Sequence, residues 1–127
     1  EIVETLLSAF SQSKIIRNCQ SVLELPFFCD IAIGAPGVSH AERLYAGIPT
    51  VLVPQSESHR ALCMNWHDEG CALYAGPEPK HIASQINALI ANKFDRARVI
   101  SHEGQRVIDG KGASRIVAEL ALRGQSI

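Results

Sequence analysis

The chain has 127 residues, 46% of them apolar and 20% charged, with a formal net charge of −1. It is long enough for one domain with a hydrophobic core. The balanced charge, without a basic stripe, argues against a nucleic-acid partner, and the absence of a long apolar run argues against a membrane span.

The sequence does not start with Met and opens in a helical pattern. We therefore interpret residues 1–127 as a single domain from a longer, two-domain protein. The four cysteines include no Cys-x-x-Cys pair, and the five histidines include no His-x-x-x-His pair. We expect the cysteines to be reduced core residues of a cytoplasmic protein, without a disulfide, metal or cofactor.

The first thirty residues combine a helical pattern with a β-prone run. Apolar residues at helical spacing predict an opening amphipathic helix: Ile2, Val3, Leu6, Leu7 and Phe10. The run at 14–19 is β-prone. A short helix is predicted at 23–29, where Pro26 is tolerated only in the first turn.

Strands and helices then alternate along the chain. Short apolar strands are predicted at 31–34 and 50–53, on either side of a helix at 39–46. The next helix is predicted at 58–69, with Gly70 as its C-cap.

A further strand is predicted at 71–75, before Gly76 and Pro77. Apolar residues at helical spacing then mark a strong amphipathic helix: Ile82, Ile86, Leu89 and Ile90. A weaker helix is predicted at 96–108 and a turn at 109–112. The last helix is marked by a similar pattern: Ile116, Val117, Leu120 and Ala121.

The predicted strands are apolar throughout rather than on alternate residues. Such strands are typical of a parallel sheet that is covered on both faces. The predicted fold class is therefore α/β, a three-layer, doubly wound, Rossmann-like parallel sheet.

The glycine loop after the first of these strands is the main candidate site. Gly34 and Gly37 flank Ala35 and Pro36, and a helix is predicted to start at Ser39. Ligands of open α/β sheets bind at the carboxyl ends of strands, and a helix N-terminus offers unpaired N–H groups to an anion. The spacing matches neither a dinucleotide fingerprint nor a Walker loop, so a simple strand–helix turn is an equal alternative.

Glu42 also has two interpretations. Ser39 and Glu42 have the spacing of a capping box, which the spacing alone favours. In the alternative, Glu42 accepts hydrogen bonds from the two hydroxyl groups of a ribose.

Three segments together resemble the C-terminal domain of GT-B-type nucleotide-sugar enzymes: Asp30-Ile-Ala-Ile-Gly-Ala35, Ser39-His-Ala-Glu-Arg43 and Leu44-Tyr-Ala-Gly-Ile-Pro-Thr50. The likeness is strongest to the UDP-sugar hydrolase of pseudaminic acid synthesis and its spore-coat polysaccharide relatives. The tail Val107-Ile-Asp-Gly-Lys-Gly-Ala113 is similar to the Val-Asp-Gly-Lys-Gly-Ala of that family. The resemblance covers roughly residues 20–120.

The resemblance implies that the domain binds UDP. The glycine loop would lie against the diphosphate, Glu42 would bind the ribose, and Ser58 and His59 would lie near the phosphates and the sugar. The implied UDP-binding residues are Gly34, Ala35, Gly37, Val38, Ser39, His40, Glu42, Ser58 and His59.

The chain also departs from the family pattern. Pro36 removes one N–H donor from the loop. Ser58 and His59 stand where the family has Asn and Gln. The segment before Lys14 is short, which suggests that a central strand is missing there.

Some remaining side chains have a structural and a functional interpretation. Trp66 and Met64 are interpreted as core or domain-interface residues. Lys111 is interpreted as a solvated lysine rather than a phosphate ligand. Arg43 either orients Glu42 or forms an exposed ion pair of little energetic value. His40 would act as an acid only with a pKa near neutrality.

The resemblance implies a half-site whose catalytic groups, unknown in this chain, come from an absent N-terminal domain. The expected parent is a UDP-amino-sugar hydrolase of surface polysaccharide or pseudaminic-type sugar biosynthesis, which releases UDP and free sugar. One alternative is the donor-binding domain of a UDP-sugar glycosyltransferase. Another is a non-enzymatic Rossmann-like interaction module.

Overall fold

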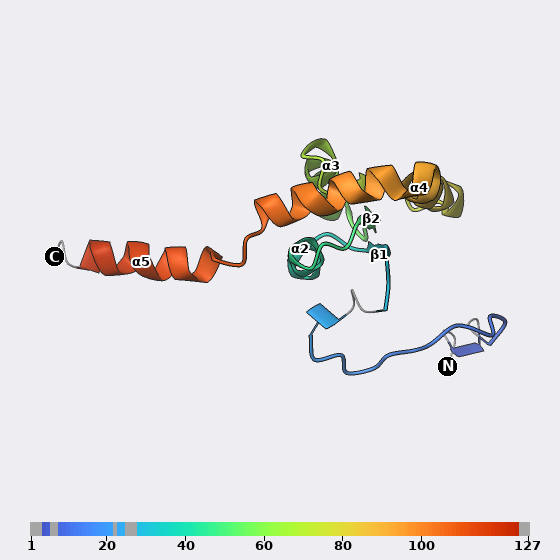
Figure 1. The fold of residues 1–127 in the computed structure, drawn as a ribbon, viewed down its shortest axis with the longest axis horizontal. Helices are drawn as coiled ribbons and strands as arrows, with labels where there is room; N and C mark the ends of the chain where they lie inside the picture. The colour runs from blue at the N-terminus through green and yellow to red at the C-terminus, as the bar shows by residue number, and fades with distance from the viewer. Residues whose placement is uncertain (1–3, 6–7, 22, 25–27, 125–127) are drawn as a thin grey trace.

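The computed structural model describes residues 4–5, 8–21, 23–24 and 28–124. At its centre is a three-stranded parallel sheet in the order β1-β2-β3 (Figure 1). The strands are β1 (Ala32–Gly34), β2 (Thr50–Leu52) and β3 (Leu73–Tyr74). The register pairs Gly34 with Leu52 and Leu52 with Tyr74, so the carboxyl ends of all three strands lie at one edge.

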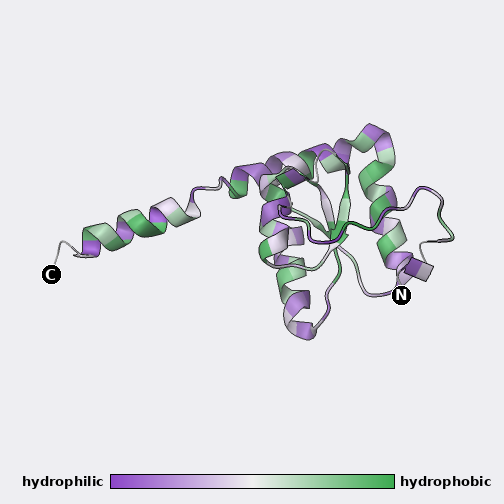
Figure 2. Cartoon of the chain, turned by 90° about the horizontal axis from the view of Figure 1, so that it is seen from below, coloured by the Kyte–Doolittle hydropathy of each residue, from purple (hydrophilic) through white to green (hydrophobic). Residues whose placement is uncertain are grey.

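Helices follow each strand: α2 (Val38–Tyr45), α3 (Glu57–Asp68) and α4 (Pro79–Val107), and α5 (Gly112–Gly124) ends the described chain. Val51 and Leu73 face α4, where they pack with Leu89 and Ile100. The alternate strand residues face α3 and pack with Cys63: Leu52 and Ala72. Figure 2 shows the hydrophobic strands between the helices. The predicted Rossmann-like α/β fold is thus confirmed, with its parallel sheet between helices.

The sequence-predicted elements from residue 31 onward are found close to their expected bounds. Gly70, with φ 73°, follows α3 as predicted. Helix α4 carries a break at residues 91–94, so its two halves correspond to the two helices predicted from the sequence. Asn92, Lys93 and Phe94 all have positive φ there, with values of 49°, 56° and 65°.

The β-prone run at residues 14–19 does not form a strand, so this prediction is wrong. These residues are in irregular, exposed backbone, although Ile15 and Ile16 favour a strand. A strand is stable only when a neighbour pairs with its backbone, and no described strand lies beside β1 on its outer edge. Ile33 of β1 is also exposed, although the sequence predicts a strand covered on both faces. The missing strand before Lys14 remains a prediction.

The first predicted helix lies largely outside the described residues. Glu4 and Thr5 are helical, and Phe10 is exposed. Of the helix expected at 23–29, residues 23–24 form a short 3₁₀ turn, and most of the remainder also lies outside the described part.

The cysteines only partly match their expected place in the core. All four are free; Cys63 and Cys71 are buried, and burial raises the pKa of both thiols. Cys19, in contrast, is exposed, so the expectation of a core position is wrong there. It precedes β1 in a segment that packs against no described strand.

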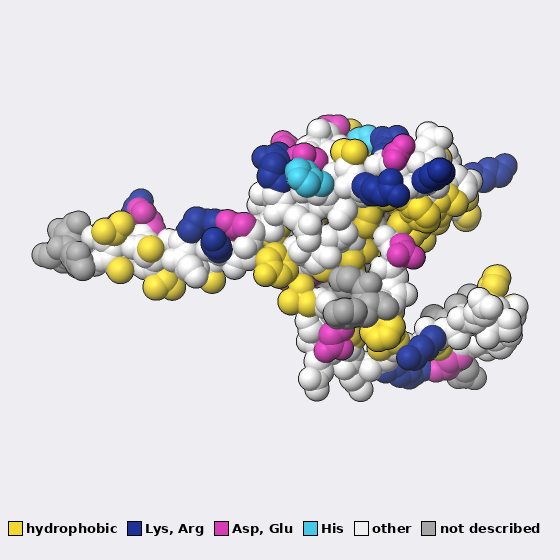
Figure 3. Space-filling model, in the orientation of Figure 1, with side chains coloured by type: hydrophobic (Ala, Val, Ile, Leu, Met, Phe, Trp, Pro, Cys, Tyr) yellow, Lys and Arg dark blue, Asp and Glu magenta, His cyan; other side chains and the backbone are white. Residues whose placement is uncertain are grey.

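Helix α5 projects away from the sheet (Figures 1 and 2), and all its residues are exposed. Figure 3 shows hydrophobic side chains along this helix, which include Ile116 at 64% and Val117 at 65% exposure. Among the described helices, none is long and apolar enough to cross a membrane.

Candidate functional site

The loops after the three strands meet at the carboxyl edge of the sheet. The Val53 amide donates to the Gly34 carbonyl (2.9 Å), and the Ala75 amide donates to the Leu52 carbonyl (2.9 Å). The N-termini of α2, α3 and α4 therefore open on the same side. This is the edge at which parallel α/β sheets bind their ligands.

The start of α2 exposes backbone N–H groups at this edge. Gly37 is the N-cap residue and has φ 150°, a conformation that favours glycine. Its carbonyl accepts hydrogen bonds from the amides of His40 and Ala41, and no side chain caps the helix. The amides of Gly37, Val38 and Ser39 donate to no residue that the structure describes, and Val38 is 80% exposed. These three amides are therefore open to an anion.

The capping box predicted for Ser39 and Glu42 is not formed. Because Gly37 begins α2, Ser39 already lies inside the first turn, and Glu42 lies beyond it. The carboxylate is exposed and caps nothing. The interpretation that spacing alone favoured is therefore wrong, and Glu42 is available for a ligand at the outer face of α2.

Arg43 is buried under the glycine loop. It is 9% exposed, and its Nη2 donates to the Ala35 carbonyl at 2.9 Å. A Cβ added to Gly34 would lie 2.9 Å from the same guanidinium group, so a larger residue there would have to displace the Arg43 side chain. Of the two interpretations of Arg43, the exposed ion pair is therefore wrong, and the guanidinium is bonded to the loop rather than to Glu42. Sequence analysis missed this contact, since arginine is rarely buried.

His40 lies on the same inner face of α2, against α3. Its side chain is fully buried, and its ring meets that of Trp66 edge to face, with 5.2 Å between the ring centroids. Burial, and then the positive charge of Arg43, lower the pKa of His40 to about 4. The imidazole is thus neutral at pH 7, which excludes the role of an acid near neutrality. Neither ring nitrogen has a hydrogen-bond partner among the described residues.

The packing of Trp66 agrees with its predicted place in the core. It is half-buried against the cluster around Leu52 and Cys63. Met64, on the same helix, is 45% exposed and so does not belong to that cluster.

Ser58 and His59 lie in the first turn of α3, at the same edge as the glycine loop. Ser56 caps this helix by accepting a hydrogen bond from the His59 amide (3.3 Å), and its Oγ lies 3.0 Å from Ser58 Oγ. Ser58 is exposed, whereas His59 is half-buried, with no described partner for its Nδ1. The fold therefore brings the two predicted segments to one edge.

Two small cavities lie at the carboxyl edge of the sheet. One, of about 220 Å³, lies between the loops after β2 and β3 and is lined by Ser56, Arg60 and Tyr74 among others. The other, of about 290 Å³, lies beside the Tyr74 carbonyl, which accepts a hydrogen bond from Gln85 (2.9 Å). Sequence analysis did not single out Tyr74 or Gln85; the position of Tyr74 at the end of a strand was the available signal.

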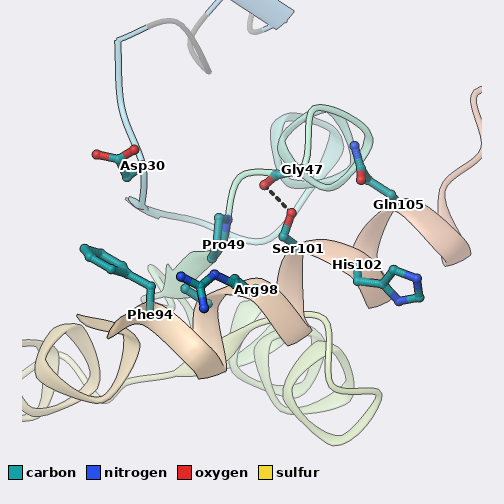
Figure 4. Close-up of a pocket in the computed structure, with 9 residues that line it drawn as sticks. Asp30, Gly47, Pro49, Phe94, Arg98, Ser101, His102 and Gln105 are labelled. Carbon is teal, nitrogen blue, oxygen red and sulfur yellow. Dashed lines mark hydrogen bonds between the residues drawn. The ribbon is translucent and has the colours of Figure 1, made fainter. Parts of the chain in front are cut away.

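A larger groove, of about 490 Å³, lies at the opposite, amino-terminal edge of the sheet (Figure 4). Asp30 and Pro49 line it just before β1 and β2, and Phe94 and Ser101 line it from α4. The hydroxyl group of Ser101 is engaged within the protein, because its Oγ donates a hydrogen bond to the Gly47 carbonyl at 2.7 Å (Figure 4). No sequence-predicted site residue lies in this groove.

Lys111 is far from the glycine loop in the fold. The turn at 109–112 packs beside Tyr45, at the opposite end of α2, where a Cβ on Gly110 would lie 2.7 Å from the tyrosine ring. The Lys111 amide donates to Asp109 (2.9 Å), and the Arg115 side chain pairs with the same carboxylate (2.7 Å). This placement favours a solvated lysine over a phosphate ligand.

The described side chains include no group of three or more His, Cys, Asp or Glu residues that could hold a metal ion. Charged side chains of both signs are mixed over the face shown in Figure 3. The chemistry available at the carboxyl edge is therefore that of backbone amides, hydroxyl groups and exposed charged side chains, among them Glu42, Glu57 and Arg60.

Comparison with known proteins gives one informative match. The chain is similar to the spore coat polysaccharide biosynthesis protein SpsG of Bacillus subtilis (strain 168). The two are 29% identical over 126 residues, which cover 94% of this chain and 36% of SpsG. The chain thus spans about a third of its relative's length. No family model matches the sequence.

Proposed function

We propose that this chain is the UDP-sugar-binding domain of a longer enzyme that acts in the synthesis of a surface polysaccharide or its amino-sugar precursor. The observation that carries the proposal is the set of three open amides at Gly37, Val38 and Ser39. A diphosphate would accept hydrogen bonds from them at the positive end of α2. The similarity to SpsG supports the same biosynthetic context.

The exposed Glu42 would bind the ribose of UDP. It lies on the helix whose N-terminus holds the diphosphate, and no cap engages its carboxylate. Ser58 and His59, at the start of α3, would contact the second phosphate or the attached sugar. Gly34 and Ala35 would shape the loop from the strand side.

The proposed reaction of the parent enzyme is hydrolysis of the glycosyl–phosphate bond, with release of UDP and free amino-sugar. None of the described residues at this edge forms a full set of catalytic acid and base. The proposal therefore assigns those groups to an N-terminal domain of the same protein, facing the carboxyl edge across a cleft.

Isothermal titration calorimetry of UDP tests the nucleotide site. We expect Glu42→Ala to weaken UDP binding roughly tenfold, as is typical when a hydrogen bond to a charged group is removed. Glu119→Ala, on α5 and far from the sheet edge, is the matched control and should bind like the wild type. Absence of UDP binding by the wild type, or equal binding by wild type and Glu42→Ala, would contradict the proposal.

A second experiment tests the reaction. The longer protein should release UDP and free sugar from a UDP-amino-sugar without an acceptor. Turnover only when an acceptor is added would instead identify a glycosyltransferase.

A further inference from the structure

The buried guanidinium of Arg43 lacks a negatively charged partner. No carboxylate of the described residues lies within ion-pair distance of it. Its Nη2 donates a hydrogen bond to the neutral Ala35 carbonyl, and its Nε has no partner among the described residues. Burial lowers the pKa of the group, while nearby Glu42 raises it, and an arginine in this setting stays charged. Buried charges are normally paired, because leaving water costs several kcal/mol per ion. The positive charge of Arg43 therefore has no neutralising partner among the described residues.

The geometry directs the charge toward the glycine loop. Arg43 lies in the second turn of α2, and its side chain reaches back along the helix, as helical side chains do. It ends against Gly34 and the Ala35 carbonyl, directly before the open amides that begin at Gly37. The loop thus carries open N–H groups at residues 37–39 and contacts a positive charge at Gly34 and Ala35.

We propose that Arg43 is a positioning residue of the anion site, which fixes the glycine loop through the Ala35 carbonyl and supplies a buried positive charge to the diphosphate of a bound nucleotide. This inference rests on the proposed function. It explains why Gly34 is needed, since a side chain there would displace the guanidinium. It also explains the unpaired charge, because the ligand supplies the missing negative partner.

A purely structural arginine would give a different result. If Arg43 only held the loop to the helix, its replacement would lower stability but would leave the electrostatic part of anion binding unchanged in the folded molecules. The salt dependence of binding separates the two cases, because it reports the charges that the anion meets.

The test is calorimetric titration of the chain with inorganic pyrophosphate and with UDP, at low and high salt. The variants are Arg43→Met, which removes the charge, and Arg43→Lys, which keeps it. Arg123→Met on the exposed helix α5 is the matched control. Thermal unfolding of each variant verifies that it is folded, and Arg43→Lys provides the test if Arg43→Met does not fold.

We expect Arg43→Met to bind both ligands roughly tenfold to a hundredfold more weakly, with a shallower salt dependence. Arg43→Lys should retain most of the salt dependence but lose part of the affinity, because an ammonium group cannot reproduce the planar fork. Wild-type affinity and salt dependence in folded Arg43→Met would overturn this inference alone. If only Arg43→Lys folds, a salt dependence well below that of the wild type would overturn it, because this variant keeps the charge.

The wild-type titrations separate this inference from the proposed function. If the wild type binds pyrophosphate but not UDP, and Arg43→Met loses the pyrophosphate, the anion site stands and the nucleotide assignment fails. If the wild type binds neither ligand, both proposals are overturned.

Discussion

Because His40 is buried and neutral in the folded protein, we expect the free energy of unfolding to decrease when the pH is lowered from 7 to 5. Its pKa is lowered from 6.5 to about 4 in the folded state, chiefly because the ring is buried and secondarily because Arg43 is near. Between these two values, the unfolded chain binds a proton that the folded chain does not. Stability therefore falls as the pH drops through 6.5 and stops falling, as far as His40 is concerned, below about 4.

The size of the effect follows from the two pKa values. A histidine that moves from 6.5 to about 4 on folding destabilises the protein by about 2 kcal/mol on going from pH 7 to pH 5. The carboxylates of Glu103 and Asp109 have lowered pKa values, so they titrate mainly below this window. His40 should therefore dominate the slope.

Urea unfolding at pH 7 and pH 5 measures this change through the fluorescence of Trp66, the single tryptophan of the chain. His40→Phe is the decisive variant, because it keeps an aromatic ring against Trp66 and removes the titration. The difference between the two pH values should shrink to a few tenths of a kcal/mol in this variant. An equal loss in His40→Phe, or no loss in the wild type, would refute the reasoning.

Three further predictions concern stability. Leu73→Ala, at a buried position of β3, should cost about 2–5 kcal/mol in urea unfolding, and a loss below about 1 kcal/mol would contradict the core assignment. Leu120→Ser on the exposed face of α5 should change stability by less than about 0.5 kcal/mol, and a larger loss would show that α5 packs against the body. Gly70→Ala and Gly110→Ala both force alanine into a positive φ and should each cost about 1–2 kcal/mol, with Gly110→Ala the worse because of Tyr45; equal melting temperatures would contradict that contact.

The α/β layering was accessible from the sequence because buried parallel strands are apolar on both faces. Thr50, Val51 and Leu52 are all buried in β2, which lies between two helical layers. The break in α4 was also accessible, since the helical pattern stops and restarts around residues 91–94.

The run at 14–19 shows where such reasoning stops. Its β-branched residues favour extended backbone, but a strand also needs a neighbour with unpaired backbone groups. No local pattern reports whether that neighbour is present. In the described chain, β1 has no neighbour on its outer edge, and the run is irregular.

The open amides of the glycine loop were predictable from the sequence, whereas the buried Arg43 beneath the loop was not. The glycines and the strand–helix order located the open amides. The sequence predicts that α2 starts at Ser39, one residue after its actual start at Val38, because Ser39 and Glu42 have the spacing of a capping box. Neither interpretation of Arg43 from the sequence, orientation of Glu42 or an exposed ion pair, places it under the loop. Its signal was the shared helix face of His40, Arg43 and Leu44, spaced at i, i+3 and i+4.

The proposed UDP site requires that the amides of Gly37, Val38 and Ser39 bind the diphosphate. An amide NMR titration of the isotope-labelled chain with UDP measures this at each residue. The largest shifts should fall on these three amides, with smaller shifts at the start of α3. Shifts confined to the groove around Asp30 and Ser101 at the opposite edge, or no shifts at saturating UDP, would contradict it.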